Sequence, residues 1–266
     1  MRKIKFWKMS GAGNDFALIT GAARTSALKS LAVRLCARKE GVGADGLLFV
    51  RRAGRGAVEV RYFNSDGSEA FCGNGSRCAA WWAHLKGLAG RKFLLKTLAG
   101  TLEAEIAGPE SVRMRMPDVK GASLAHKGKY PRGVGLVHFL NTGVPHAVAP
   151  VRGLEKLDVA TLGRLLRFNK AFGRAGANAD FVEVRGGRVQ VRTYERGVEG
   201  ETLACGTGIT AAAVALSLAG SLTPPVTLLS RSGEKFKVWL KPAGKKASKI
   251  VLQGPARLIF EGEFKC

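Results

Sequence analysis

Two short stretches of this sequence determine how its fold can be interpreted. Residues 69–80 read EAFCGNGSRCAA, and residues 203–214 read LACGTGITAAAV. Each places a cysteine directly before Gly-x-Gly, and the small and apolar residues that follow are typical of a helix. The two cysteines, Cys72 and Cys205, are 133 residues apart by subtraction, which is half of the 266-residue chain. This spacing indicates an internal repeat.

Other sequence features recur in the same order, with offsets of 131 to 135 residues by subtraction. The pairs are SGAGND at Ser10 with TGVPHA at Thr142, ADGLLFVRR at Ala44 with ADFVEVRGG at Ala179, VEVRYF at Val58 with VQVRTY at Val189, and FLLKTLAGTLEAEI at Phe93 with VTLLSRSGEKFKVWL at Val226. Chance would hardly produce five ordered pairs. We infer a tandem duplication of one unit of roughly 130 residues, an ordinary domain size.

Strands outnumber helices in each copy, which predicts an α/β (α+β) fold. Alternating residues in KIKFWKMS and AVEVRYF predict strands, and KFLLKT and TLEAEI around LAG predict a hairpin. Helices are expected over 25–38, 73–85 and 206–218. The last two are apolar nearly all round, so each should lie buried against or inside a curved sheet.

The repeat also predicts where the chain divides. Pro and Gly interrupt the pattern in MPDVKGASLAHKG, residues 116–128. We expect an N-terminal half over 1–117, joined by the C-terminal segment 258–266, and a C-terminal half over 118–257. The two halves should be pseudo-symmetric, with the active site in the cleft between them.

Composition narrows the class of protein. Hydrophobic residues make up 46% of the chain, yet no apolar run of about 18 residues predicts a membrane span. The basic, mixed start MRKIKFWKMSGAGNDF lacks the features of a secretory signal, so we expect a cytoplasmic protein. Five cysteines without a CxxC pair and only four histidines favour reduced thiols and no metal site.

The net charge of +23 raises the question of a nucleic-acid or anionic-membrane surface. The basic residues are scattered, however, and their densest groups, GKKASK (244–249) and HKGKYPR (126–132), are short and loop-like. No nucleic-acid module signature accompanies them. We therefore expect a solvated basic surface, with neither a nucleic acid nor a membrane as partner.

A cysteine before a glycine turn and a helix start has a chemical rationale. The first N–H groups of a helix lack intrahelical partners and can hold a carboxylate or phosphate. Glycine lets a ligand approach this backbone closely. The same helix end favours a thiolate, so the pKa of the cysteine should fall toward neutrality.

Two such elements facing one cleft would place a substrate α-carbon between two sulfurs. One thiolate can remove the α-hydrogen while the opposite thiol donates a proton to the other face, which inverts the stereocentre. A lone Cys-Gly pair is more often a buried turn residue, and a disulfide or redox pair is a further alternative. The duplication favours catalysis over these interpretations.

Five motifs carry a family resemblance over essentially the whole chain. KMSGAGNDF, FNSDGSEAFCGNGSRC, GVPHAV, GANADFVEV and YERGVEGETLACGTG resemble the diaminopimelate epimerases. The resemblance implies an isomerase of lysine biosynthesis that interconverts LL- and meso-diaminopimelate without pyridoxal phosphate or any other cofactor or metal. It also implies halves in which a mixed sheet wraps round a central helix, assembled as a homodimer.

The resemblance also implies roles for single residues. Cys72 and Cys205 match the acid/base pair, with Cys205 as acceptor and Cys72 as donor in the LL-to-meso direction. His146 and Glu195 match polar residues close to the reacting amino group. The residues that match substrate contacts are Asn14, Asn64, Gly73, Asn74, Asn178, Glu195, Arg196, Gly206 and Thr207.

Structural roles remain open for several of these residues. Asn14 and Asn64 lie in turn-like segments, His146 could be a structural histidine, and Arg196 could form a solvated ion pair with its neighbour. Cys36 and Cys78 are expected to pack in the core.

Two departures from the family pattern leave the substrate open. Gly46 stands where many members have Gln, and Val144 stands where many have Asn. A different distal contact or looser recognition would follow. A histidine racemase or a proline racemase of the same fold is an alternative, although proline racemases have His where this chain has Asn74. A non-catalytic basic binding protein is a further alternative.

Overall fold

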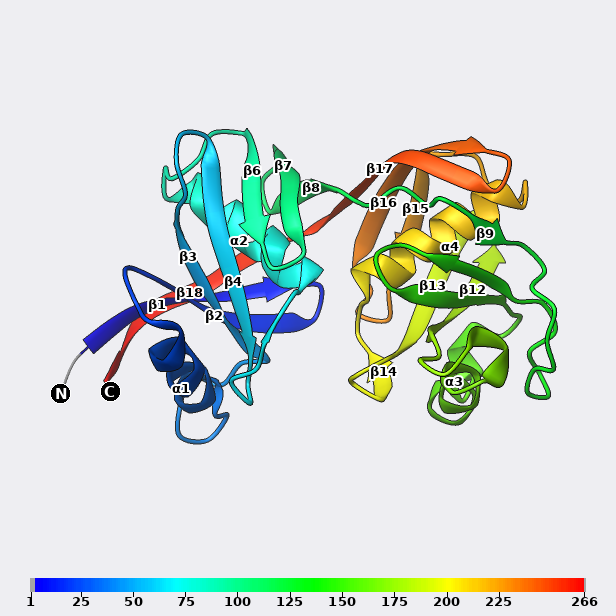
Figure 1. Cartoon of the computed structure of the whole chain (residues 1–266), viewed down its shortest axis with the longest axis horizontal. Coiled ribbons are helices and arrows are strands. Elements are labelled where there is room, and N and C mark those ends of the chain that lie inside the picture. Colours follow the sequence, from blue (N-terminus) through cyan, green and yellow to red (C-terminus); the bar gives the residue numbers. More distant parts are fainter. Residues whose placement is uncertain (1–2, 266) are drawn as a thin grey trace. The chain divides into compact units, whose positions relative to one another are not determined.

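The computed structural model describes residues 3–265, so Cys266 lies outside the described part. The chain forms two compact units (Figure 1). Unit 1 takes the chain up to Met114 and again from Gly254, and unit 2 takes Arg115–Gln253. None of the helices within residues 3–265 is long and apolar enough to cross a membrane.

Unit 1 is a mixed sheet with one helix on each face. Its strands run in the order β18, β1, β2, β3, β4, β6, β7, β8, with β5 beside β4. The β2–β3 and β4–β6 pairs are parallel, and the others are antiparallel. The elements are β1 (Lys3–Gly11), β2 (Asn14–Thr20), α1 (Thr25–Cys36), β3 (Gly46–Arg52), β4 (Ala57–Asn64), β5 (Glu69–Ala70), α2 (Gly73–Leu85), β6 (Lys92–Thr97), β7 (Gly100–Gly108), β8 (Ser111–Arg115) and β18 (Arg257–Lys265).

The two faces of the unit 1 sheet carry different cores because successive strand residues point to opposite sides. Phe16 and Leu18 of β2 pack with Trp82 of α2 in one cluster. Ala17 and Ile19, which alternate with them, pack with α1 in another. Helix α2 is therefore buried against one face of the sheet, as predicted from its apolar surface.

Unit 2 repeats this architecture. Its strand order is β9, β10, β11, β12, β13, β15, β16, β17, with β14 beside β13. The elements are β9 (Ala122–Ser123), β10 (His138–Asn141), β11 (Pro145–Pro150), α3 (Val159–Arg167), β12 (Asn178–Arg185), β13 (Arg188–Glu195), β14 (Gly200–Thr202), α4 (Gly206–Leu218), β15 (Val226–Leu229), β16 (Lys235–Ala243) and β17 (Lys246–Pro255), with short 3-10 turns at Leu154–Lys156 and Lys170–Phe172.

Helix α4 is the buried helix of unit 2. Every residue from Gly208 to Ser217 is buried. An alanine-rich surface of this kind lets the strands approach the helix from several sides. The predicted fold class, the two repeated halves and the bounds of both buried helices are confirmed.

Strand register shows which positions of the two units are equivalent. In unit 1, Leu48 pairs with Tyr62 and lies beside Leu18; in unit 2, Asp180 pairs with Thr193 and lies beside Val148. Leu48 and Asp180 also lie beneath the same helix position, because a Cβ on Gly75 would meet Leu48 and a Cβ on Gly208 would meet Asp180, so the two residues are equivalent. By the same register Phe16 is equivalent to His146, Gly46 to Asn178, and Asn64 to Glu195.

This register corrects two of the sequence matches. Aligning the two Ala-Asp pairs made Asp45 the counterpart of Asp180, and aligning SGAGND with TGVPHA made Asn14 the counterpart of His146. Both alignments were wrong, by three and two residues. Sequence similarity in short strands of similar composition does not determine the register, whereas backbone pairing does.

Candidate active site

Cys72 is the N-cap of α2. Its backbone is extended, with φ −134° and ψ 114°, and its Sγ accepts a hydrogen bond from the Gly75 N–H at 3.4 Å. Its carbonyl oxygen accepts from both the backbone N–H and the hydroxyl of Ser76, each at 2.9 Å. The sulfur thus lies at the end of the helix where N–H groups concentrate, as the sequence predicted.

Cys205 is the N-cap of α4 in the same conformation, with φ −114° and ψ 110°. Its Sγ lies 3.3 Å from Thr207 Oγ1. Burial raises the pKa of the Cys205 thiol well above its usual value, and the carboxylates of Glu195 and Asp180 raise it further. Hydrogen bonds from Thr207 and the Gly208 N–H offset only part of this rise.

The expectation that the helix end lowers the cysteine pKa is therefore wrong for Cys205. Desolvation disfavours the charged thiolate, and two nearby negative charges add to that effect. Both terms depend on tertiary packing, which the local motif does not reveal.

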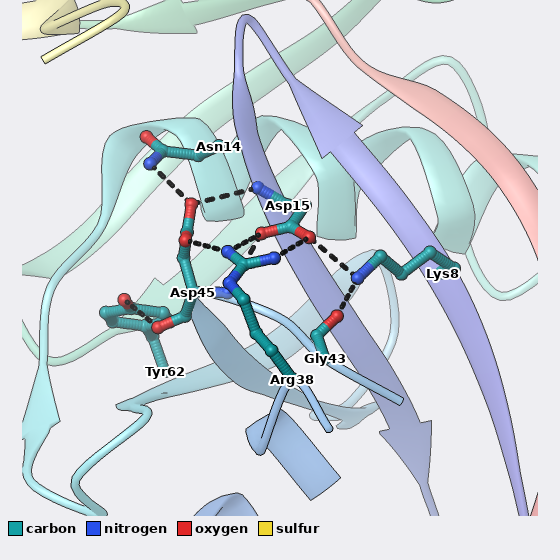
Figure 2. Close-up of polar contacts among 7 residues, drawn as sticks. All are labelled: Lys8, Asn14, Asp15, Arg38, Gly43, Asp45 and Tyr62. Carbon is teal, nitrogen blue, oxygen red and sulfur yellow. Dashed lines mark hydrogen bonds and ion pairs between the residues drawn. The ribbon is translucent and has the colours of Figure 1, made fainter. Parts of the chain in front are cut away.

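A network of ionic and polar groups centres on Asp15, Asp45 and Arg38 in unit 1, with Asn14 bonded to it through Asp45 (Figure 2). Asp15 and Asp45 form a reciprocal pair of hydrogen bonds. The Asp15 N–H donates to Asp45 Oδ2 at 3.2 Å, and the Asp45 N–H donates to Asp15 Oδ1 at 3.0 Å. Arg38 bridges both carboxylates, at 3.1 Å to Asp15 and 2.7 Å to Asp45. Lys8 binds Asp15 Oδ2 at 2.7 Å and also donates to the Gly43 carbonyl.

These contacts stabilise the charged form of Asp15. Burial alone would raise the pKa of its carboxyl group, but the hydrogen bonds from Lys8 and Arg38 outweigh burial and lower it. The result is a rigid anionic group at the end of the hairpin that carries Asn14.

Asn14 connects this network to the first turn of α2. Its Nδ2 donates to Asp45 Oδ2 at 3.0 Å, and its Oδ1 accepts from Asn74 Nδ2 at 2.6 Å. Asn74 Oδ1 in turn accepts from Arg77 at 2.6 Å. Because Asp45 accepts only, the amide of Asn14 is fixed in one orientation.

Asn64 is the last residue of β4 and begins the turn that follows it. Its Nδ2 donates to Ser68 Oγ at 2.9 Å, and its N–H donates to the Ser68 carbonyl at 2.8 Å. The structure thus shows the turn role that the sequence left open for Asn64, and its substrate role stays a prediction.

Polar residues at the ends of three strands meet in unit 2. His146 Nδ1 lies 2.7 Å from Asp180 Oδ2, and both side chains are fully buried. Asn178 Nδ2 lies 3.5 Å from His146 Nε2, and Asn178 Oδ1 accepts from the Arg196 N–H at 2.7 Å. Burial raises the pKa of Glu195, and Thr202 and, to a smaller degree, His146 offset part of this rise.

The structure therefore brings the predicted residues together within each unit. In unit 1, Cys72, Gly73 and Asn74 form the first turn of α2, to which Asn14 is bonded. In unit 2, Cys205, Gly206 and Thr207 begin α4, and Glu195 and Asp180 act electrostatically on Cys205. Within residues 3–265 no group of three or more His, Cys, Asp or Glu side chains could hold a metal ion.

Sequence reasoning missed three residues that organise these sites. Asp45 and Asp180 each follow an alanine at or near the start of a predicted strand, and an acidic residue beside an apolar run could have indicated both. Arg77, in α2, is 1% exposed and reaches Asn74 and the Pro255 carbonyl. A basic residue in the middle of a predicted helix carries no such signal.

The structure shows what surrounds Gly46 and which residue of unit 1 corresponds to Val144. A Cβ at Gly46 would lie 2.6 Å from the Phe63 carbonyl oxygen and 2.8 Å from Tyr62 Cζ. The Tyr62 ring therefore occupies the space beside Gly46, so the glycine opens no extra room there. Val144 lies two residues before His146, and Asn14 lies two residues before Phe16, so Val144 is the counterpart of Asn14. Unit 1 therefore has an amide side chain at this position, and unit 2 has valine.

A model of the family "Diaminopimelate epimerase" matches residues 6–121 and 138–259. The chain belongs to the diaminopimelate epimerase family. It is 40% identical over 279 residues to the diaminopimelate epimerase of Aquifex aeolicus, with 97% of each chain covered. It is 43% identical over 248 residues to that of Archaeoglobus fulgidus, with 85% of this chain and 86% of the relative covered. The resemblance seen in the motifs is confirmed, and with it the assignment to the isomerases.

Solved structures at lower identity share the fold of this diaminopimelate epimerase family member. A Bacillus anthracis phenazine biosynthesis protein of the PhzF family matches with a TM-score of 0.77 at 17% identity and full coverage of both chains. A probable proline racemase from Agrobacterium radiobacter matches with a TM-score of 0.70 at 17% identity, covering 97% of this chain and 92% of that one. At this identity the likeness concerns the fold alone.

Cys36 and Cys78 are expected to resist alkylation in the folded protein. Both are buried, as predicted, and burial raises the pKa of each thiol to about 12. At pH 8 only ~1 in 10⁴ such thiols is a thiolate, the reactive form. Iodoacetamide followed by peptide mass spectrometry should find both unmodified at pH 8 and both modified in urea. Rapid labelling of either in the native protein would contradict the packing described.

Gly46→Ala should lower the free energy of unfolding by about 1–3 kcal/mol, because the new methyl group overlaps backbone and ring atoms. Gly90→Ala is the matched control: no atom lies within 4 Å of a Cβ there, so a change within about 0.5 kcal/mol is expected. Urea unfolding measures both. Equal stability of the two variants would mean that the space beside Gly46 is open.

Proposed function

We propose that this chain interconverts LL- and meso-diaminopimelate by proton transfer between two thiols, Cys72 and Cys205. Family membership over nearly the whole chain supports the reaction. The observation that carries the mechanism is the repeated N-cap cysteine, which gives each unit one sulfur at the start of one buried helix.

The proposed step is balanced in protons and electrons. In the LL-to-meso direction the Cys205 thiolate takes the α-hydrogen as a proton, and the C–H electron pair moves into the α-carbon and its carboxylate. The Cys72 thiol then gives its proton to the opposite face of that carbon. The configuration is inverted, Cys205 ends as a thiol and Cys72 as a thiolate, and the reverse reaction uses the opposite states.

The helix starts supply stabilisation for the intermediate. Negative charge that develops on the reacting carboxylate needs preorganised donors, and the first N–H groups of a helix are of this kind. We assign this role to the backbone of Gly73-Asn74 and of Gly206-Thr207. The mechanism requires both helix starts to reach the same carboxylate, one from each unit.

The raised pKa of Cys205 is compatible with its role as acceptor once the substrate is considered. Glu195 and Asp180 disfavour the thiolate when no cation is present. The α-ammonium group of an amino acid carries a positive charge, and opposite charge nearby favours the ionised thiol. Substrate binding would therefore supply the charge that lowers the pKa of Cys205 where proton abstraction needs it.

We assign the distal end of the substrate to the amides and to Arg196. A guanidinium can bind a carboxylate through two parallel hydrogen bonds, which suits a substrate with an amino-acid group at each end. Asn14, Asn64 and Asn178 would contribute the remaining polar contacts, with Asn14 held in one orientation by Asp45.

Replacing either N-cap cysteine should abolish turnover. Cys72→Ala and Cys205→Ala are each expected to lower kcat by at least ~10²-fold, the usual contribution of a positioned acid or base. Cys36→Ala is the matched control. This buried thiol is the last residue of α1 and belongs to the core between α1 and the sheet, so kcat should change less than about threefold. Deuterium incorporation at the α-carbon in D₂O, followed by NMR, measures the reaction.

The same assay identifies the substrate. LL-Diaminopimelate, L-histidine and L-proline are compared side by side with the unsubstituted protein. Exchange with diaminopimelate alone is the expected result. Exchange confined to histidine or proline would reject the substrate but keep the chemistry, whereas full activity of either cysteine variant would reject the two-thiol mechanism.

A further inference from the structure

The first turns of α2 and α4 pack against three equivalent strand positions, but the side chains differ in polarity. Unit 1 has Phe16, Leu48 and Tyr62 at these positions, and unit 2 has His146, Asp180 and Thr193. The equivalence rests on register and on a glycine in the same place of each helix. A Cβ on Gly75 would meet Leu48 at 2.9 Å, and a Cβ on Gly208 would overlap Asp180 Oδ1.

The fold itself does not require a carboxylate at this position. Leu48 and Asp180 are both 0% exposed, so the same architecture accommodates an apolar side chain in unit 1. Burying a carboxylate away from water is energetically costly unless it is well paired. A costly group that only one of two equivalent sites contains is a sign of function rather than of packing.

Asp180 uses its two oxygens on two different partners. Oδ2 lies 2.7 Å from His146 Nδ1, and Oδ1 accepts from the Thr193 hydroxyl at 2.8 Å. An ionised carboxylate accepts hydrogen bonds only, so the contact with His146 requires a proton on Nδ1. The threonine holds the carboxylate in place from the other side.

This arrangement leaves Nε2 as the ring nitrogen that can gain or release a proton. Nε2 lies 3.5 Å from the Asn178 side-chain nitrogen, an amide donor that is compatible with a lone pair on Nε2. Glu195 is close enough to His146 for the two to interact electrostatically. Glu195 and Asp180, the two carboxylates near His146, also raise the pKa of the Cys205 thiol.

We propose that Asp180 is a positioning residue: it fixes His146 in the tautomer with a proton on Nδ1, which leaves Nε2 able to accept a proton during the reaction. This inference rests on the proposed function, since it assumes proton transfer between the two thiols. Unit 1 lacks an equivalent device, because Phe16 and Leu48 stand in its place. The two thiols therefore work in unequal surroundings although their backbone settings match.

The tautomer can be measured without substrate. The chain has only four histidines, so ¹⁵N-histidine labelling and a long-range ¹H–¹⁵N spectrum at pH 8 should resolve His146, assigned by its loss in His146→Gln. We expect a protonated Nδ1 in the unsubstituted protein. In Asp180→Leu, whose new side chain matches Leu48, both neutral tautomers should become populated. An unprotonated Nδ1 in the unsubstituted protein would overturn the proposal.

Kinetics test whether the tautomer matters. Asp180→Leu and the near-isosteric Asp180→Asn should each lower kcat by about 10²-fold or more, while KM changes less than about threefold because Asp180 is fully buried. Asp158→Asn is the matched control: it removes a carboxylate of the same unit at the N-cap of α3, where asparagine can still accept from the Thr161 N–H, so Nδ1 of His146 should stay protonated and kcat should fall less than about threefold.

The outcomes separate the possible roles. A merely structural Asp180 would change stability and leave kcat per folded molecule unaltered, and that result would overturn the proposal. If Asp180→Leu fails to fold, Asp180→Asn and the spectrum of the unsubstituted protein still test whether Asp180 fixes the tautomer of His146. If the unsubstituted protein exchanges no α-hydrogen, the proposed function fails, whereas the spectrum reports the Asp180–His146 contact independently.

Discussion

Both halves of this protein depend on the close approach of a buried helix to the strands beneath its first turn. Glycine makes this approach possible: Gly75 and Gly208 have no Cβ, and any side chain there would meet the neighbouring strand at 2.9 Å or less. The approach places the N-terminal N–H groups of each helix, and the cysteine that caps them, near the ends of central strands of the sheet. The repeated Cys-Gly-x-Gly motif is therefore a packing requirement as well as a chemical one.

Much of this could be predicted because it is local. The bounds of α2 and α4 follow from a glycine turn and an uninterrupted apolar run, and the duplication follows from ordered matches between the halves. Register could not be predicted, because neighbouring strand residues of similar character give several near-equal alignments. Leu48 and Asp180 share no side-chain chemistry, so only backbone pairing shows that they are equivalent.

The electrostatics of the sites also could not be predicted from the sequence. The helix end at Cys205 predicted a lowered pKa, but burial and two carboxylates from strands β12 and β13 reverse the sign. Those carboxylates come from positions 180 and 195, distant from the cysteine in sequence. In the same way, the departure at Gly46 suggested a different distal contact or looser recognition, but the sequence did not reveal that Tyr62 of the next strand occupies the space beside Gly46. Long-range packing decides such questions.

Strand β18 has a consequence for how this chain is made. It pairs antiparallel with β1 along its length, from Lys3 opposite Lys265 to Ser10 opposite Arg257, and so joins the two ends of the sequence in one sheet. During synthesis the whole of unit 2 leaves the ribosome before β18 does. Until then β1 has one unpaired edge, a surface that promotes association with other chains. The half that is made first is thus the half that is finished last, and the nascent protein must carry an open sheet edge through most of its translation.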